Sequence, residues 1–151
     1  MRGEILGRVA TDLLSVPPLI FRLIRRRLVM TPLADTDVDI KLLHFEIMRL
    51  LKDEGTRHPA AIGERLLIAK AQMTHLIDKL VDLGFVKREM DATDRRTLNI
   101  TLTEKGSNVL DEQENLVLNS MRDNMSSLSE KELETLSDSL RNMRDILYKL
   151  Q

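Results

Sequence analysis

Cysteine is absent from this sequence of 151 residues, and only 3% of the residues are aromatic, with no tryptophan and a single tyrosine. The absence of cysteine excludes disulfide bonds, thiolate zinc sites and cysteine nucleophiles. It is compatible with the cytosol, and we expect a cytoplasmic protein. Proteins that bind single-stranded nucleic acids stack the bases on aromatic side chains, so the scarcity of aromatic rings argues against that class.

Long apolar runs are also missing. The longest one, residues 13–21, contains Pro17 and Pro18, and a cluster of positive charges follows it instead of preceding it. The run is too short to span a bilayer, and its flanks differ from those of a secretory signal. We therefore expect no membrane-spanning segment and no membrane partner.

Residue types that carry out catalysis or bind metals are present, but not at a useful spacing. The three histidines, His44, His58 and His75, are scattered and lack the i, i+4 pairing of a helical zinc site. The sequence contains no glycine-rich phosphate loop and no nucleophile elbow. We expect the protein not to be an enzyme and to use no metal and no cofactor.

Charge is distributed unevenly, although the net charge is only −1. Residues 1–30 carry six basic and two acidic side chains, and residues 65–106 carry eight basic and six acidic ones. Residues 31–64 and 107–151 are net acidic. A locally positive segment in a nearly neutral chain suits a protein that contacts a polyanion with one face.

Apolar residues recur at helical spacing over most of the chain, and two short runs between residues 85 and 102 read as a hairpin, the second alternating cleanly. Pro17 and Pro18 interrupt the first helical pattern, which predicts a separate helix before them. Ser129 and Glu132 have the spacing of a capping box that opens the last helix. The predicted helices cover residues 4–15, 19–30, 40–54, 58–67, 69–83, 104–125 and 130–150, and the predicted strands cover 85–90 and 97–102.

A short helix, a tight turn, a second helix and a hairpin, in this order, form a winged helix-turn-helix. We therefore predict a mainly α-helical fold with a small β-hairpin wing. The second helix of this motif enters the DNA major groove, where glutamine can bond adenine and threonine can contact a thymine methyl group. The polar residues of 69–83 that lie outside its apolar stripe are Lys70, Gln72, Thr74, His75, Asp78 and Lys79. The alternative is an ordinary solvated helix face.

The stretch "DATDRR", residues 91–96, concentrates charge at the tip of the predicted hairpin. Arg95 and Arg96 lie at the tip and Arg88 lies on the incoming strand, and arginine suits the narrow minor groove. We predict that Asp91 and Asp94 hold the arginines in fixed rotamers through charge-assisted bonds. The alternative is a solvated turn in which aspartate favours the bend.

Residues 61–106 resemble the DNA-binding lobe of the MarR family of transcriptional regulators. The resemblance is carried by "THLIDKLVDLGFVKR" at 74–88, D-x-x-D-R-R at 91–96 and I-x-L-T-x-x-G at 100–106. It implies DNA contacts by the recognition helix and by the wing. The matching positions are Lys70, Ala71, Gln72, Thr74, His75 and Lys79 in the helix, and Asp94, Arg95 and Arg96 in the wing.

The resemblance also implies a homodimer with N- and C-terminal dimerisation helices, residues 1–36 and 107–151, around a lobe at 37–106. Two lobes would bind a palindromic operator in double-stranded DNA. Such proteins usually repress transcription, and many release DNA when a small phenolic or anionic effector binds. Phe21, His44, Phe45 and Met48 are the candidates for that effector pocket; the alternative for His44 is a histidine of the core.

The sequence departs from the family pattern at several positions. Ala69 stands where a serine often caps the recognition helix, Leu67 where a glycine is common in the turn, and His75 where arginine is frequent. Loss of the serine cap costs about 1 kcal/mol. The rival hypothesis is therefore a protein-interaction module that has kept the winged fold and lost DNA binding. The basic residues of the helix and the wing argue against this rival.

Overall fold

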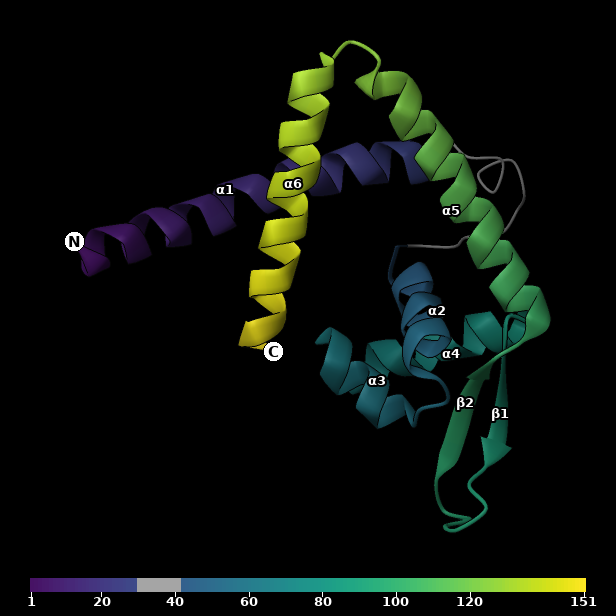
Figure 1. Ribbon diagram of the computed structural model, residues 1–151. Coiled ribbons are helices and arrows are strands. Elements are labelled where there is room, and N and C mark those ends of the chain that lie inside the picture. The colour runs from purple at the N-terminus through teal and green to yellow at the C-terminus, as the bar shows by residue number, and fades with distance from the viewer. Residues whose placement is uncertain (30–41) are drawn as a thin grey trace. The chain divides into compact units, whose positions relative to one another are not determined.

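The computed structural model describes residues 1–29 and 42–151 (Figure 1). They divide into two compact units, Met1–Val117 and Leu118–Gln151. The elements are α1 (Arg2–Val29), α2 (Leu42–Glu54), α3 (Pro59–Leu66), α4 (Lys70–Asp82), β1 (Val86–Met90), β2 (Leu98–Leu102), α5 (Glu104–Met125), α6 (Glu130–Leu147) and a 3-10 turn (Tyr148–Leu150). This order confirms a mainly α-helical fold with a hairpin wing. The helices of the described residues include none that is both long and apolar enough to cross a membrane.

Helix α1 runs without interruption through both prolines. The sequence-based prediction of a separate helix at 4–15 is therefore wrong. Pro17 and Pro18 lack the N–H groups that would bond to the carbonyls of Leu13 and Leu14, but the proline ring holds φ in the helical range. Leu13 and Leu14 are 40% and 80% exposed, so water is available to bond the freed carbonyls. The first two residues of the predicted helix 40–54 lie outside the described residues.

One hydrophobic core joins α2, α3, α4, the hairpin and the first turns of α5 into a unit that we call the lobe (residues 42–117). The apolar stripe of α4, which includes Met73, Leu76 and Leu80, is buried in this core. Burial of this stripe leaves the opposite face of α4 toward solvent. The side chains that are buried most completely are Ile47, Met48, Ile62, Ile77, Leu80, Ile100 and Leu110.

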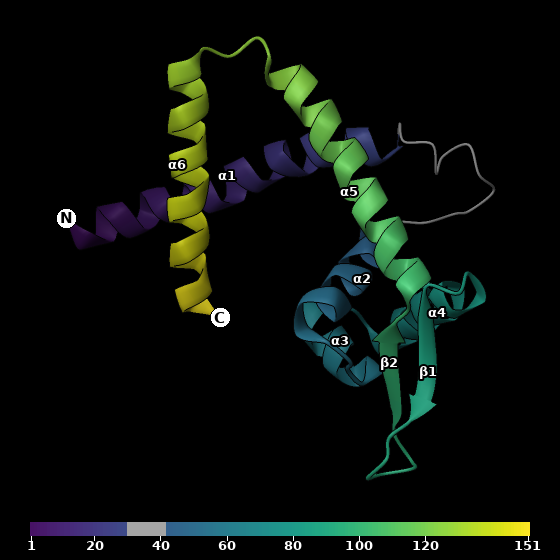
Figure 2. The ribbon, with the colours of Figure 1, turned by 45° about the vertical axis from the view of Figure 1, so that its right-hand side comes forward.

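The two wing strands pair antiparallel, in a register that runs from Val86 opposite Leu102 to Met90 opposite Leu98. Figures 1 and 2 show the hairpin projecting beyond α2, α3 and α4 as a two-stranded ribbon. Val86 and Ile100 are buried at its base, whereas four of the five β1 residues are exposed. The outer part of the wing therefore lacks support from the core.

Two backbone positions shape the lobe. Leu67, in the turn between α3 and α4, adopts the left-handed conformation at φ 56° and ψ 44°, and its side chain is 92% exposed. Gly106 lies in the first turn of α5, where a Cβ atom would come within 2.1 Å of the Phe85 carbonyl oxygen. The glycine of the L-T-x-x-G pattern thus allows α5 to pack directly on the backbone that enters the wing.

Cross-helix ion pairs hold α5 against α2. Arg49 pairs with Glu114, and Lys52 pairs with Asp111. Leu110, directly before Asp111, is buried, so the lobe end of α5 is attached by both apolar and charged contacts.

Helix α6 begins with the capping box predicted from the sequence. The Ser129 hydroxyl accepts a bond from the Glu132 N–H at 3.2 Å, and the Glu132 carboxylate accepts one from the Ser129 N–H at 2.8 Å. Hydrogen bonding of the Glu132 carboxylate to Ser129, above all to its backbone N–H, lowers the pKa of Glu132 below its ordinary value. No residue of α6 is buried within the described part of the chain.

Candidate nucleic-acid interface

The exposed face of α4 carries the side chains that the sequence assigns to the recognition helix. Lys70, Ala71, Gln72, Thr74 and His75 are exposed, and Lys79 is partly buried. The Thr74 hydroxyl donates to the Lys70 carbonyl at 3.2 Å, which leaves its methyl group for apolar contact. Lys70, Ala71, Gln72, Thr74 and His75 thus lie at the start of the helix, whereas Lys79 lies in its last turn.

The N-terminus of α4 lacks a side-chain cap. Ala69 occupies the N-cap position and has no group that can accept a bond from the first turn. The N–H groups at this end carry a partial positive charge. The Ala69 side chain has no atom that could accept a hydrogen bond from them. The departure from serine therefore leaves donors that suit a phosphate oxygen.

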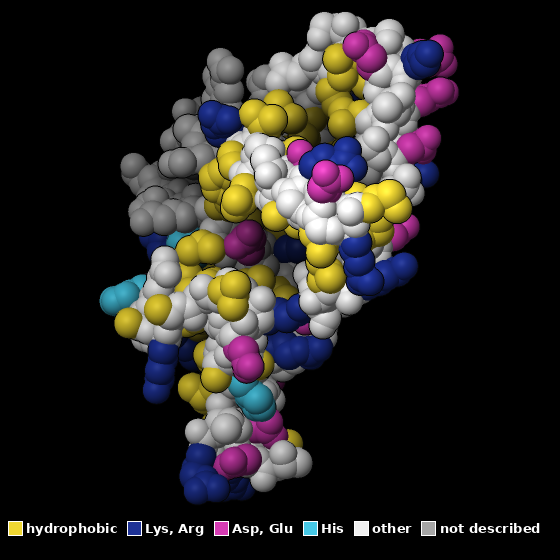
Figure 3. Space-filling model, turned by 90° about the vertical axis from the view of Figure 1, so that its left-hand side faces the viewer, with side chains coloured by type: hydrophobic (Ala, Val, Ile, Leu, Met, Phe, Trp, Pro, Cys, Tyr) yellow, Lys and Arg dark blue, Asp and Glu magenta, His cyan; other side chains and the backbone are white. Residues whose placement is uncertain are grey.

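At the wing tip, Asp94 contacts Arg96. The Asp94 carboxylate accepts bonds from the Arg96 backbone N–H at 3.1 Å and from its Nε at 3.3 Å. The Arg96 side chain is 92% exposed, so its terminal nitrogens extend into solvent. Arg95 is exposed as well. Figure 3 shows Lys and Arg side chains gathered with acidic ones at the lower end of the molecule, where the wing lies.

Asp91 has a different role from the one predicted for it. One of its carboxylate oxygens accepts bonds from the Thr93 N–H at 2.9 Å and the Thr93 hydroxyl at 2.8 Å. These bonds lower the pKa of Asp91 below its ordinary value. Asp91 therefore closes the turn at the start of the wing tip, and of the two wing aspartates it is Asp94 that contacts an arginine.

Arg88 forms an ion pair with Asp78. This pair joins the first wing strand to α4, and the Arg88 side chain remains 35% exposed. Arg88 is thus placed between the two predicted DNA-contacting elements, with part of its charge compensated within the lobe.

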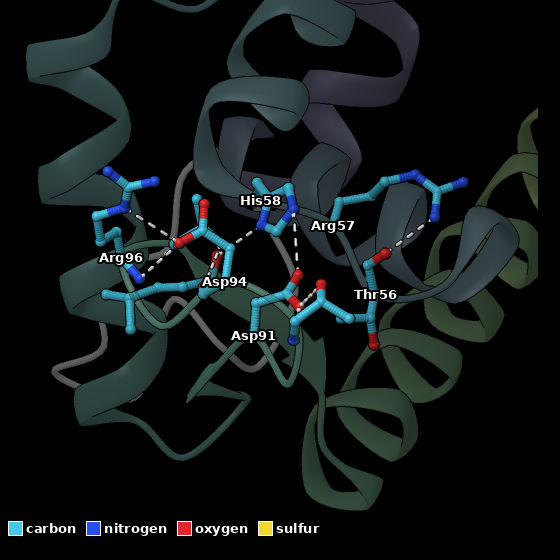
Figure 4. Close-up of polar contacts among 9 residues, drawn as sticks. Thr56, Arg57, His58, Asp91, Asp94 and Arg96 are labelled. Carbon is cyan, nitrogen blue, oxygen red and sulfur yellow. Dashed lines mark hydrogen bonds and ion pairs between the residues drawn. The ribbon is translucent and has the colours of Figure 1, made fainter.

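Sequence reasoning missed the segment before α3, residues 56–58. The Thr56 hydroxyl lies 2.9 Å from that of Thr101, and Arg57 exchanges two backbone bonds with Ile100, at 3.2 and 2.8 Å. The His58 ring contacts Leu98 and Asp91 on the wing (Figure 4). These partners are some 40 residues apart in the chain. No local sequence pattern predicts such a pairing.

The candidate effector residues lie on two helices. His44 and Met48 are buried on α2, and Phe45 beside them is partly buried. Phe21 lies on α1 and is 44% exposed. The pocket that these residues were predicted to line stays a prediction. The described residues include no group of acidic and histidine side chains that could hold a metal ion.

An exposed polar helix face beside an arginine-tipped hairpin, both on one packed lobe, defines a winged helix-turn-helix protein. Residues 38–97 match the MarR family model. Over this range the chain is similar to the MarR family.

Known proteins show the same similarity. The uncharacterised HTH-type transcriptional regulator YkoM of Bacillus subtilis is 40% identical over 67 residues, which are 44% of this chain and 44% of that relative. The chain therefore spans less than half the length of that relative. The crystal structure of RV1404 from Mycobacterium tuberculosis is 18% identical and has a TM-score of 0.76, covering 93% of this chain and 92% of that one. The crystal structure of a mutant MarR from E. coli, complexed with operator DNA, is 24% identical and has a TM-score of 0.61. It covers 91% of this chain and 92% of that one. These two structures share the fold.

Proposed function

We propose that this protein is a sequence-specific, double-stranded DNA-binding transcriptional regulator. The observation that carries the proposal is the pairing of two surfaces on one lobe. The start of α4 exposes lysine, glutamine and threonine side chains, and the wing presents Arg96 in an orientation fixed by Asp94. The shared fold with a MarR structure that contains operator DNA supports the same conclusion.

Each surface would contact a different groove. The start of α4 would lie in the major groove, where Gln72 can bond an adenine edge and Lys70 a guanine or a phosphate. Arg96 would enter the adjacent minor groove, because its guanidinium is flat, weakly hydrated and held in place in advance. Arg95, Lys79 and His75 would contribute mainly phosphate contacts, so binding should weaken steeply with salt.

The active form is a homodimer in this proposal. Helices α1 and α6 expose large apolar side chains along their length, among them Phe21 at 44%, Leu136 at 40% and Leu140 at 41%. Rows of exposed leucines on helices mark protein–protein contact surfaces. Residues 1–36 and 107–151 would form the dimer region, and residues 37–106 would bind DNA. Two symmetric lobes would then bind a palindromic operator.

The regulation that we propose rests on the resemblance to the MarR family. The protein would act as a repressor and release its operator when a small phenolic or anionic effector binds. The residues proposed to contact this effector are Phe21, His44, Phe45 and Met48.

The first test is selection of the purified protein on a pool of random double-stranded DNA at about physiological salt, followed by sequencing. We expect enrichment of a palindrome whose half-sites lie about one helical turn apart. If a folded, dimeric protein enriches no sequence, the proposed function is wrong, and the winged lobe is better explained as a protein-interaction module.

A further inference from the structure

A short hydrogen-bonded segment fastens the wing to the start of α3. We call this segment, residues 56–58, the wing brace. Its backbone at Arg57 pairs with Ile100 like a third strand at the base of the sheet, and the Thr56 hydroxyl meets that of Thr101. Beyond this point the wing has two strands only, and a two-stranded hairpin alone is marginally stable in water. The wing brace therefore determines how far toward its tip the wing is held rigidly.

The outermost contact of the wing brace is the imidazole ring of His58. Its Nδ1 lies 3.1 Å from the Leu98 carbonyl oxygen, and its Nε2 lies 3.5 Å from a carboxylate oxygen of Asp91. Leu98 and Asp91 flank the wing tip, one on each side of it. The ring thus reaches both sides of the hairpin at the point where regular pairing ends, as Figure 4 shows.

The two atoms that face the ring can only accept hydrogen bonds. A carbonyl oxygen and an ionised carboxylate have no proton to give, and a neutral imidazole has one N–H. Only the imidazolium, which has two N–H groups, can therefore donate a proton toward both oxygen atoms at once. The bonds from Thr93 favour the ionised form of Asp91, and the ring faces no acid from its own helix, because the first turn of α3 has none. Arg57, next to the ring, directs its guanidinium to the Thr56 carbonyl at 2.9 Å.

Capping of α3 does not explain this arrangement. His58 occupies the N-cap position, but its side chain makes no capping bond to the helix. Pro59, at the first position of the helix, has no N–H group that would need a partner there. The ring is directed to the wing and not to its own helix.

We propose that His58 is a positioning residue for DNA binding, whose imidazolium ring ties the wing to the start of α3. The proposal rests on the proposed DNA-binding function. Helix α3 packs on α4, so a wing held to α3 has a fixed distance and angle to the recognition helix. Holding the wing before DNA arrives reduces the conformational entropy that binding would otherwise remove.

The sign of the pH effect follows from the bonds. The protonated ring can donate to the Leu98 carbonyl and form an ion pair with Asp91 at the same time, whereas the neutral ring has one N–H group only. The brace should therefore be stronger at acidic pH than at alkaline pH. DNA affinity should be lower at about pH 8 than at about pH 6 through this residue.

The first experiment needs no DNA. Hydrogen exchange of the free protein at pH 6 reports on the wing amides of Asp91 and Thr97, which bond to Thr97 O and Asp94 O. We compare His58→Gln, which keeps a donor near the Nε2 position, with His58→Asn, which keeps one near Nδ1. His75→Gln is the matched control, because it removes an exposed histidine that the wing does not contact. We expect both His58 variants, and not the control, to lose protection at the wing amides. Unchanged wing protection with an unchanged melting temperature would overturn the proposal.

The second experiment measures DNA affinity at pH 6 and pH 8. Both proteins carry His75→Gln, so the recognition helix contributes no titrating ring, and one of them also carries His58→Gln. The probes are a duplex enriched by the selection described above and a random-sequence duplex at low salt. At pH 6 we expect the protein with His58 to bind about three- to tenfold more tightly, which corresponds to the net value of about one ordinary hydrogen bond. The difference in DNA affinity between the two proteins should become smaller toward pH 8.

The outcomes separate the proposal from the function on which it rests. An affinity difference of equal size at both pH values would overturn the role of the imidazolium, since a merely structural contact would give that result. Equal affinities at pH 6 would overturn positioning altogether. The wild-type protein is measured beside the two variants. If it binds neither duplex, the proposed function fails and the DNA role of His58 fails with it. The exchange experiment then still decides whether His58 holds the wing.

Discussion

The lobe and helix α6 contain the same kinds of apolar residues at the same helical spacing, yet only the lobe buries them. In the lobe, Ile47, Met48 and Leu80 are completely buried. In α6, Leu133, Leu136 and Leu140 are each about two-fifths exposed. Periodicity therefore identifies the apolar face of a helix, but the presence of a packing partner within the chain decides whether that face is covered.

The two regions also differ in what keeps them helical. The lobe helices are held by their common core, whereas α6 relies on local contacts such as the Ser129–Glu132 capping box. Most isolated helices of this length are marginal in water, because packing supplies most helical stability. The low pKa of Glu132 means that the box is complete above the ordinary pKa of glutamate and is lost as the pH falls through the lowered value. A partner for the apolar face of α6 would add the missing stability.

The largest effect should come from disturbing the lobe where it is packed most closely. In Gly106→Ala, the new methyl group would lie 2.1 Å from the Phe85 carbonyl oxygen and 2.8 Å from the Leu102 side chain. We expect a loss of about 3 kcal/mol in the free energy of unfolding, at the upper end for overpacking by one carbon. Chemical denaturation measures it. Gly7→Ala is the control, because a Cβ atom there meets nothing within 4 Å. Equal stability of the two variants would contradict the described packing.

The next effect should appear on α6 without reaching the lobe. Leu136→Asp combined with Leu140→Asp places two charges on the apolar face, and the two changes together should weaken the proposed dimer by about 2 kcal/mol. Sedimentation at decreasing concentration measures the dissociation. Ser137→Asp, on the same helix, should leave the dimer intact. A double variant that is still fully dimeric would show that α6 is not part of the dimer contact.

On the lobe surface, Arg96→Ala should separate DNA binding from folding. The Arg96 side chain is 92% exposed and its loss opens no cavity, so the melting temperature should stay unchanged. DNA binding should weaken by about 1–3 kcal/mol, as for other arginines in a groove. Fluorescence anisotropy at constant salt measures the affinity. If Arg96→Ala binds like wild type, the wing arginine has no role in binding.

The smallest effect should be a gain in stability. Leu67 has a left-handed backbone conformation and an exposed side chain, so Leu67→Gly removes strain without removing packing. Glycine adopts this conformation about 1 kcal/mol more easily than other residues, although its extra freedom in the unfolded chain reduces the gain. We expect the midpoint of denaturation to rise slightly. A clear decrease would mean that the Leu67 side chain contributes contacts that its exposure does not suggest.

Features that depend on local contacts were predictable from the sequence, and features that depend on packing were not. The α4 stripe, the hairpin and the Ser129–Glu132 box were predictable, because each depends on residues that lie within a few positions of one another. The continuity of α1 through Pro17 and Pro18 was not, because the solvent exposure of Leu13 and Leu14 makes the two prolines tolerable. Exposure is a property of the folded chain and not of the local sequence.

The interface was predictable to a similar degree. The Asp94–Arg96 contact spans two residues and follows from the wing pattern, although its role on DNA stays a prediction. The contacts of His58 with Leu98 and Asp91 depend on how the segment before α3 returns to the wing, so they required the structure. The different tasks of Asp91 and Asp94 required it as well, since the two residues occupy similar positions in the sequence.

In the proposed complex, two copies of the chain, joined through their apolar helices, place two lobes on one DNA duplex. The native mass of the complex with a duplex enriched by selection tests this arrangement. We expect a complex of two chains and one duplex, which is lost when Leu136 and Leu140 are both replaced by aspartate. A complex of one chain and one duplex, or no complex from a folded protein, would contradict it.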